Sequence, residues 1–515
     1  MKKYILLRNM VVSLFIAGAF TSMNAQLLNT PASLELMKES QVWRNSGNAA
    51  GLILDAPVKY GEFNINYTTY TGDFHRPQQA NNGNSLDFFT EGATWLNKIY
   101  VWGQFDYSRD NQKGVNFKQS IIDPYRGMPY YITDLNESNW ENQFYNMRFK
   151  VNFPISKKIF LGLDGSYNVA QGAKQRDIRT TNLSYALRVK PAIVYTPTKS
   201  HYLGIGMEYS NFKEEANPDM VNASDYQKYY ELYGLGTAVE NIGSGKTVNY
   251  MGNNVGGNVQ YAYYQNRLKI LAEGYFLFQV EDAEFSFTQP QKVGTVRKNS
   301  WGSNLFVQYK GEDFSHYLDM SYAGSKADGI QYIKQNTSSD GWQVLHSNVR
   351  SVCKADEVAL KYSLIANRGD EYKWRLGAQV RYQDNEDEYI LPHSVKQAEN
   401  LLFSVNGKVN LALSEALEQR LLIGLTAGYN KNLSGEYQYN GSNTDYSVVT
   451  DFEQNDLNYQ ITDFYHLSGS VGYSQRLSEK SKTAVHIEGS FHYQHTKDFD
   501  FGNRSLFRLS LGCNF

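Results

Sequence analysis

Cysteine, proline and long hydrophobic runs are all scarce in this sequence. Only two cysteines, Cys353 and Cys513, and 11 prolines occur among 515 residues. The topology argued below places the two cysteines near opposite ends of the fold, so we expect neither a disulfide nor a cysteine-based zinc site. Beyond the amino-terminal region, no stretch approaches the roughly 18 apolar residues of a membrane-spanning helix. The formal net charge of −2 lacks the positive excess that nucleic-acid binding requires, so we expect no nucleic-acid partner.

Aromatic residues and glycine are abundant instead. The chain contains 40 Tyr, 27 Phe and 41 Gly, and its mean hydropathy is −0.53. It is therefore too aromatic for a disordered protein and too polar for a helical membrane protein. Transmembrane β-barrels combine these two properties, because half of every strand faces a water-filled lumen.

The last eleven residues carry the strongest single pattern. Phe507, Leu509, Leu511, Cys513 and Phe515 fall on one face of an extended segment, and Arg508, Ser510, Gly512 and Asn514 fall on the other. A strand that is apolar outside, polar inside and aromatic at its end is typical of the closing strand of an outer-membrane β-barrel. We expect the barrel assembly machinery to recognise Phe515. We expect the lipid bilayer of the outer membrane to surround the strands.

The amino-terminal residues predict export. Lys2, Lys3 and Arg8 flank an apolar stretch, and small residues up to Ala25 follow it, so residues 1–25 are predicted to be a cleaved signal peptide. Residues 26–56 do not alternate. A short helix over 33–39 and an irregular stretch over 43–52 are expected there. This segment is too short for a separate plug domain and could tuck into the barrel as a small hatch.

Residues 57–515 are predicted to form the barrel itself. Short turns alternate with long polar connections, and each turn joins two alternating runs of about ten or more residues. The expected turns, placed in the periplasm, are 96–98, 154–157, 197–200, 265–267, 310–313, 367–371, 414–418 and 477–481. The expected extracellular loops are 72–84, 109–141, 171–182, 213–251, 281–298, 324–354, 385–400, 431–463 and 496–503.

Counting the segments between these connections gives an all-β fold, a transmembrane antiparallel up-and-down β-barrel of about 18 strands, with 14 to 16 remaining possible. A soluble sandwich or propeller also uses alternating strands. It does not explain the export signal, the terminal strand and the one-sided loop lengths together.

The alternation also predicts which side chains line the lumen. Ten basic residues are expected to point inward, which are Arg148, Lys150, Arg188, Lys190, Lys373, Arg375, Arg381, Lys408, Arg420 and Arg508. Fewer acids accompany them, among them Glu62, Asp164, Glu208, Glu273, Asp319 and Glu488. Such a surplus favours anions in a polar channel. Pairing across the wall as a structural ladder is an equal alternative.

Two further groups of residues are candidate sites. In the penultimate hairpin, His466 is expected opposite His492 with Glu488 on the same lumenal face, a set that could hold a transition metal or could simply fill the lumen with polar groups. The acidic residues Asp384, Glu386, Asp387 and Glu388, and Asp451, Glu453 and Asp456, are expected in solvated loop tips. No nucleophile elbow, zincin motif or phosphate loop is present, so we expect neither an enzyme nor a cofactor.

The sequence resembles a family of uncharacterised outer-membrane barrel proteins of gut-type Gram-negative bacteria. The resemblance rests on residues 43–52, on the loop Gly72 to Pro77, on the segment WGSNLFVQYKGEDFSHYLDMSY from Trp301, and on the closing strand. It implies an outer-membrane location and no particular activity. A weaker likeness joins Asn48, Ala49, Ala50, Gly51 and Leu52 to the hatch motif of the fatty-acid transporter superfamily, with Ala49 where that motif has proline.

These observations predict an outer-membrane barrel for the passive passage or capture of a small solute. A different class of function is a non-conducting accessory or assembly partner, whose loops dock a surface receptor, a lipoprotein or a secretion component. A barrel hydrolase is a third class, for which the sequence offers no assembled set of catalytic residues.

Overall fold

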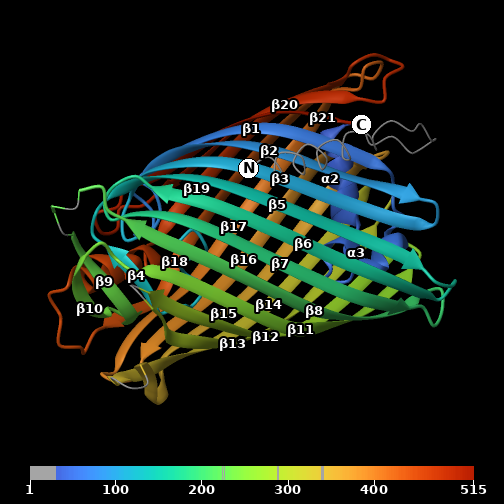
Figure 1. Cartoon of the computed structure of the whole chain (residues 1–515). Helices are drawn as coiled ribbons and strands as arrows, with labels where there is room; N and C mark the ends of the chain where they lie inside the picture. The colour runs from blue at the N-terminus through green and yellow to red at the C-terminus, as the bar shows by residue number, and fades with distance from the viewer. Residues whose placement is uncertain (1–29, 223, 226, 287–288, 338–340) are drawn as a thin grey trace, which may run out of the picture.

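The chain folds as one closed antiparallel barrel. The computed structural model describes residues 30–222, 224–225, 227–286, 289–337 and 341–515. Eighteen strands follow one another around the wall (Figure 1), and β1 (Tyr60–Gly72) pairs with the last strand, β21 (Asn503–Asn514), to close it. The predicted fold class and strand number are confirmed. The predicted signal peptide, and residues 26–29 of the predicted hatch, lie outside the described residues.

The other elements of the barrel wall run in chain order. They are β2 (Asn82–Leu96), β3 (Ile99–Val115), β5 (Ser138–Pro154), β6 (Ile159–Lys174), β7 (Arg179–Tyr195), β8 (His201–Asp219), β11 (Thr247–Gln265), β12 (Leu268–Ser286), β13 (Pro290–Lys310), β14 (Phe314–Thr337), β15 (Gly341–Arg368), β16 (Glu371–Tyr389), β17 (Ser394–Ser414), β18 (Gln419–Gln438), β19 (Phe464–Arg476) and β20 (Ala484–His495).

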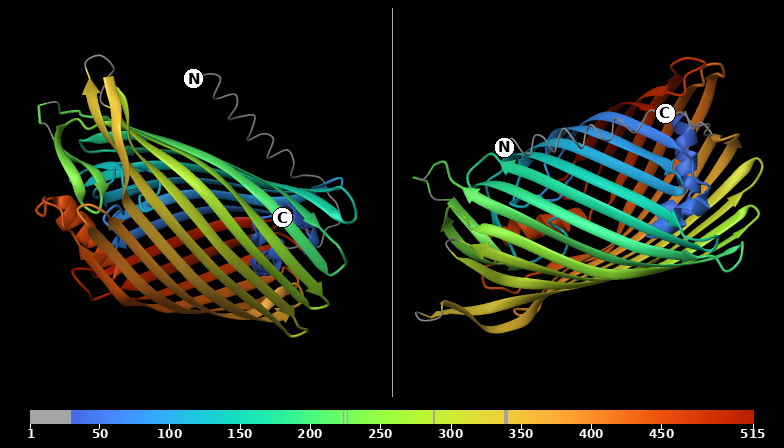
Figure 2. Two further views of the ribbon diagram at one scale, coloured as in Figure 1. Left: turned by 90° about the horizontal axis from the view of Figure 1, so that it is seen from below. Right: turned by 45° about the vertical axis from the view of Figure 1, so that its right-hand side comes forward.

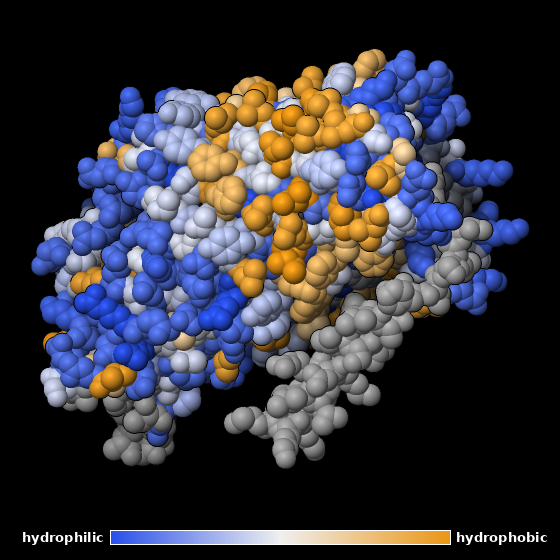
Figure 3. Space-filling model, turned by 90° about the horizontal axis from the view of Figure 1, so that it is seen from above, coloured by the Kyte–Doolittle hydropathy of each residue, from blue (hydrophilic) through white to orange (hydrophobic). Residues whose placement is uncertain are grey.

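On β1 the inward and outward faces are those that the alternation predicts. On β1, Ile65 and Tyr67 are 43% and 48% exposed on the outer surface, whereas Glu62 reaches an inner lysine, Lys38, at 2.6 Å. Seen in space-filling form, hydrophobic residues gather in a band across the molecule with hydrophilic residues on both sides of it (Figure 3). This is the surface that a barrel presents to lipid.

The last residue of the chain packs against a glycine of β1 where the barrel closes. The backbone of Gly61 exchanges hydrogen bonds of 2.8 and 2.9 Å with Phe515. The Phe515 ring lies where a Cβ atom of residue 61 would stand, closer than 3.0 Å. The first strand therefore needs glycine at this position for the last residue to pack against it.

All eight predicted short turns are present, and they lie at one end of the barrel. Two of them contain an asparagine at positive φ, Asn97 at 59° and Asn266 at 50°. Asparagine tolerates this left-handed backbone better than most residues do, which suits it to tight turns.

At the opposite end, several predicted loops are strands. Residues 281–298, 324–354 and 385–400 lie mostly in β12 to β17, which run on past the apolar band. In β14 and β15 the pairing continues to Thr337 and Gly341. The predictions of loops there were wrong because strands that leave the membrane carry polar residues on both faces. The alternating pattern then disappears, although the hydrogen-bond ladder between the strands continues.

Three long connections at this end contain structure of their own. A three-stranded sheet is formed by β4 (Tyr131–Asp134), β9 (Gln227–Gly234) and β10 (Thr237–Gly243). The connection between β18 and β19 folds as a π-helical turn, η2 (Val448–Glu453), followed by α4 (Gln454–Gln460). We call these connections, together with residues 73–81 and 116–130, the outer cap.

At the turn end, the segment before β1 lies inside the barrel (Figure 2). It consists of α2 (Pro31–Ser40), α3 (Val42–Asn45) and the 3-10 helix η1 (Ala49–Asp55). We call residues 30–56 the hatch. Its core is Trp43, which is fully buried with Ala50 against Leu271 and Val194 of the wall.

Within the described part of the chain, none of the helices has the length and apolar character needed to cross a membrane.

Candidate functional site: the lumen between hatch and cap

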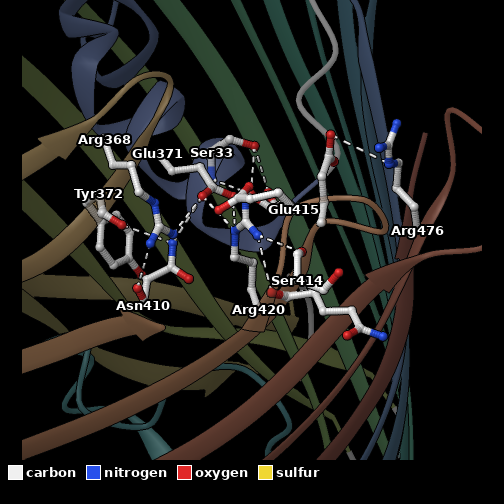
Figure 4. A network of polar contacts seen from close by, with 12 residues as sticks. Ser33, Arg368, Glu371, Tyr372, Asn410, Ser414, Glu415, Arg420 and Arg476 are labelled. Atoms are coloured by element: carbon white, nitrogen blue, oxygen red, sulfur yellow. Dashed lines mark hydrogen bonds and ion pairs between the residues drawn. The ribbon is translucent and has the colours of Figure 1, made fainter. Parts of the chain in front are cut away.

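The hatch is fastened to the inner rim of the barrel by one buried carboxylate (Figure 4). Glu371, the first residue of β16, accepts hydrogen bonds from Arg420 and Arg368, each at 2.8 Å. The hydroxyl of Thr30, the N-cap residue of α2, donates to the other side of the same carboxylate. Helix α2 is therefore anchored through its N-cap to a pair of arginines on the wall.

Two further contacts between the hatch and the wall are made by side-chain amides. Asn152 on β5 donates to the carbonyl oxygen of Ala50 at 2.5 Å. Asn48 in the hatch donates to Gln260 on β11 at 2.9 Å. Both asparagines are fully buried. The sequence gave no indication of these two contacts, since their partners lie more than 100 residues away in the chain and the hatch has no repeating pattern.

Asp55, at the end of η1, is a buried acid within the hatch. It accepts hydrogen bonds from the backbone N–H groups of Trp43 at 2.6 Å and Arg44 at 3.1 Å, and from the Tyr264 hydroxyl at 3.1 Å. Burial raises the pKa of Asp55 from its ordinary value of 3.8 to about 6, although Lys269 and the hydrogen bonds act in the opposite direction.

This shift predicts that the hatch is held less firmly as pH rises from about 4 to about 6. In that window the folded protein keeps the Asp55 proton while the unfolded chain releases it, so stability falls with rising pH. We expect amide hydrogen exchange in the hatch to be faster at pH 7 than at pH 5 after correction for intrinsic rates. In Asp55→Asn this difference should disappear. A difference of the same size in the variant would mean that another group titrates.

A cavity of about 360 Å³ lies between the hatch and the wall of β3 to β7. Its hatch side is made by Gln41, Arg44, Asn45, Ser46, Gly47 and Leu52, and its wall side by Tyr100, Trp102, Gln104, Arg148, Lys150, Asp164, Arg188 and Lys190. The volume is in the range of small-molecule sites. Four of the ten predicted lumenal cations therefore meet in one place.

Most of the predicted lumenal cations are paired. The ion pairs are Lys150 with Asp164 at 3.6 Å, Arg188 with Asp164 at 3.3 Å, Lys190 with Glu208 at 2.6 Å, Arg375 with Glu39 at 3.4 Å, Lys408 with Glu35 at 2.6 Å and Arg420 with Glu371 at 2.8 Å. At these positions the cations are therefore paired, as in the structural ladder that is the alternative to an anion-favouring lining. Two of its carboxylates, Glu35 and Glu39, come from the hatch.

Four cations of the set form no ion pair among the described residues. Arg508 donates to Thr68 at 3.1 Å, and Arg148 lies over the Trp102 ring at 5.8 Å. Arg381 lies on the inward face of β16, in register with Leu402 and Ala359 of its neighbours. Lys373 is the extra residue of a bulge between β15 and β16 and is exposed.

The histidine set does not converge on one point. His466 pairs with Gln494, and Ser468 with His492, so the expected pairing of His466 with His492 is wrong by two residues. The two rings still approach diagonally, with centroids 5.9 Å apart. Glu488 lies four residues from His492 along β20, about 13 Å away, and its nearest cation is Lys408 at 3.9 Å. Among the described residues, no group of three or more His, Cys, Asp or Glu side chains could hold a metal.

The outer cap is tied to the wall by a buried ion cluster. Lys396 on β17 contacts Glu453 at 2.6 Å and Asp456 at 2.9 Å. Arg76 contacts Asp456 at 2.6 Å and lies 3.3 Å from the centre of the Tyr125 ring. The two cations hold the pKa of Asp456 below its ordinary value despite burial.

The acidic residues of this connection were predicted to be solvated, and for Glu453 and Asp456 that was wrong. They are 5% and 2% exposed, because the turn that bears them folds back into the mouth of the barrel. The other acidic run, 384–388, belongs to β16 and not to a loop.

Comparison with known proteins places the chain in a family without assigning a ligand. No curated protein matches it. Solved structures similar to it include the ferric preacinetobactin receptor BauA of Acinetobacter baumannii, with 10% identity, a TM-score of 0.40, and 89% of this chain and 80% of that chain covered. They also include the ferric citrate transporter FecA, with 8% identity, a TM-score of 0.41, and 88% and 78% covered. A third is the FrpB iron transporter of Neisseria meningitidis, with 9% identity, a TM-score of 0.37, and 88% and 82% covered.

A likeness to the fatty-acid transporter superfamily is not shown by these comparisons. Residues 49–515 match a family whose description is "Family of unknown function (DUF6850)", which agrees with the resemblance expected from the sequence. The chain belongs to this family of unknown function.

Proposed function

We propose that this protein is an outer-membrane barrel for the uptake of a small solute, which crosses the lumen past the outer cap and the hatch. The observation that carries the proposal is the cavity between hatch and wall, which is polar, of ligand size and inside a barrel with an apolar outer band. The signal peptide predicted from the sequence and the apolar face of β21 support the outer membrane as its location.

The wall of the barrel also indicates how the hatch would limit passage. Gly162 on β6 faces the hatch, and a Cβ atom there would come closer than 3.0 Å to the backbone of Ala49 and Ala50. The close approach of η1 to the wall therefore requires glycine at this position. Passage past a hatch packed this closely against the wall requires the hatch to move, so we do not propose a permanently open pore.

The test is the conductance of the refolded chain in a planar bilayer, compared with Gly162→Ala. We expect brief, infrequent openings for the natural sequence and at least severalfold more open time for Gly162→Ala, since overpacking pushes η1 from the wall. Gly469→Ala on β19 is the matched control. A Cβ atom there would meet no described atom within 4 Å, and its strand neighbours Leu467 and Val471 are exposed on the outer surface, away from the hatch.

A second candidate function is favoured by the same arrangement. A barrel with the hatch inside one end and the cap at the other fits a non-conducting accessory partner of an uptake or secretion complex. If neither the natural protein nor Gly162→Ala conducts, although both are folded, uptake through the lumen is overturned and the accessory role stands.

A further inference from the structure

Basic side chains outnumber acidic ones in the lining of the cavity between the hatch and the wall. Five cations line it, Arg44, Arg148, Lys150, Arg188 and Lys190. Three carboxylates lie within 4.0 Å of these cations. They are Asp164, Glu208 and Glu91, the last at 2.7 Å from Arg44. Glu273 lies beside the cavity as well, since it accepts a hydrogen bond from the backbone N–H of the lining residue Gly47 at 2.9 Å and interacts with Lys150 and Lys190. Asp106, farther along β3, is hydrogen-bonded by the lining residue Gln104 at 2.7 Å.

Two arginines are the groups with unused capacity. Arg148 is exposed to the lumen and forms no ion pair among the described residues. Arg188 shares Asp164 with Lys150, and its Nε–H is buried without an acceptor in the described structure. A buried donor of this kind is normally satisfied. Guanidinium groups also offer paired N–H donors that match the geometry of carboxylate, phosphate and sulfate.

We propose that this cavity binds a small solute bearing an oxyanion, with Arg148 and Arg188 as its ligands. The proposal rests on the function proposed above, since it takes the lumen as the path of the solute. The solute is a free molecule and not a lipid headgroup, because the lining side chains point away from the bilayer into the lumen. Guanidinium donors inside a protein wall attract an anion more strongly than the same groups in water do.

The same cavity connects the solute to the hatch. Lys150 reaches from β5 to the carbonyl oxygen of Arg44 at 2.8 Å, and Arg44 itself lines the cavity and pairs with Glu91. An anion bound to the wall arginines therefore lies against the hatch segment 44–47. Occupancy of the site and the position of the hatch are expected to influence each other.

The experiment is calorimetric titration of the refolded protein at fixed ionic strength with phosphate, sulfate and glucuronate, and with glucose as the neutral counterpart of glucuronate. We expect at least one anion to bind and glucose not to bind. Arg148→Gln and Arg188→Gln should each weaken that binding about ten- to hundredfold, as the loss of a charged hydrogen bond does. The matched control is Arg381→Gln, which removes an unpaired lumenal arginine outside the cavity and should change affinity less than twofold.

Three results would overturn the site. These are no binding of any of the three anions, equal binding of glucose and glucuronate, or equal weakening by Arg381→Gln, which would mean diffuse attraction by the whole lumen. Arg148→Gln removes no ion pair, so it remains informative if Arg188→Gln does not fold. Anion binding without conductance would refute uptake and keep the site, whereas conductance without binding would refute the site alone.

Discussion

Replacing Glu371 by glutamine is expected to release the hatch from the inner rim, with a loss of about 3–5 kcal/mol in the stability of that contact. The carboxylate is 5% exposed and joins Arg420, Arg368 and the N-cap hydroxyl of Thr30. The glutamine amide keeps the shape and one acceptor. It leaves Arg368 without its ion-pair partner, and it leaves Arg420, of which only 6% of the side chain is exposed, with the exposed Glu415 as its remaining counter-charge.

The measurement is hydrogen exchange of the α2 amides together with bilayer conductance. Glu415→Gln is the matched control, because Glu415 contacts the same arginine at 2.9 Å but is 73% exposed. An exposed pair contributes at most about 1 kcal/mol, so this variant should keep a protected α2. If Glu371→Gln and Glu415→Gln behave alike, the hatch is held by its packing around Trp43 and not by the carboxylate.

The barrel wall could be predicted from the sequence because its information is local. A side-chain period of two, repeated over ten residues, fixes both the strand and its face, as in Ile65 and Tyr67 against Asn64 and Asn66. Turns were found for the same reason. The alternating pattern predicts the strands only within the membrane, because β14 and β15 need no apolar face beyond it.

The candidate site could not be predicted, because its residues meet through contacts with no local signal. Thr30 and Glu371 are 341 positions apart, and Arg44 and Lys150 are 106 apart. The alternation placed Lys150 and Arg188 in the lumen correctly. It did not indicate that the hatch would stand opposite them. It also did not indicate that hatch carboxylates would pair with Arg375 and Lys408 on the other side of the barrel.

The same holds for the outer cap. The sequence predicts that Asp456 is solvated, because its neighbours in sequence are polar. Its partners, Arg76 and Lys396, come from two other parts of the chain. A buried charge is stable only where such partners converge, and their convergence is a property of the closed barrel and not of any single segment.

The second large effect is expected on the outer surface, at the middle of the closing strand. Leu509→Arg should destabilise the folded barrel in a bilayer by about 2–4 kcal/mol, because it places a cation on the lipid face near the midplane. Leu509 is 37% exposed there and pairs with Tyr67 of β1, itself 48% exposed. The measurement is the free energy of unfolding by guanidinium in phospholipid vesicles.

Ser510→Arg tests the same strand from its other face. Ser510 hydrogen-bonds Asn66 in the lumen and stands opposite Glu488 on β20, so an arginine at this position stays in water and gains a cross-strand carboxylate. We expect its unfolding free energy to lie within about 1 kcal/mol of the natural protein. The contrast depends only on which way two neighbouring side chains point. Equal losses in the two variants would therefore contradict the register of β21, and with it the inward placement of Arg508.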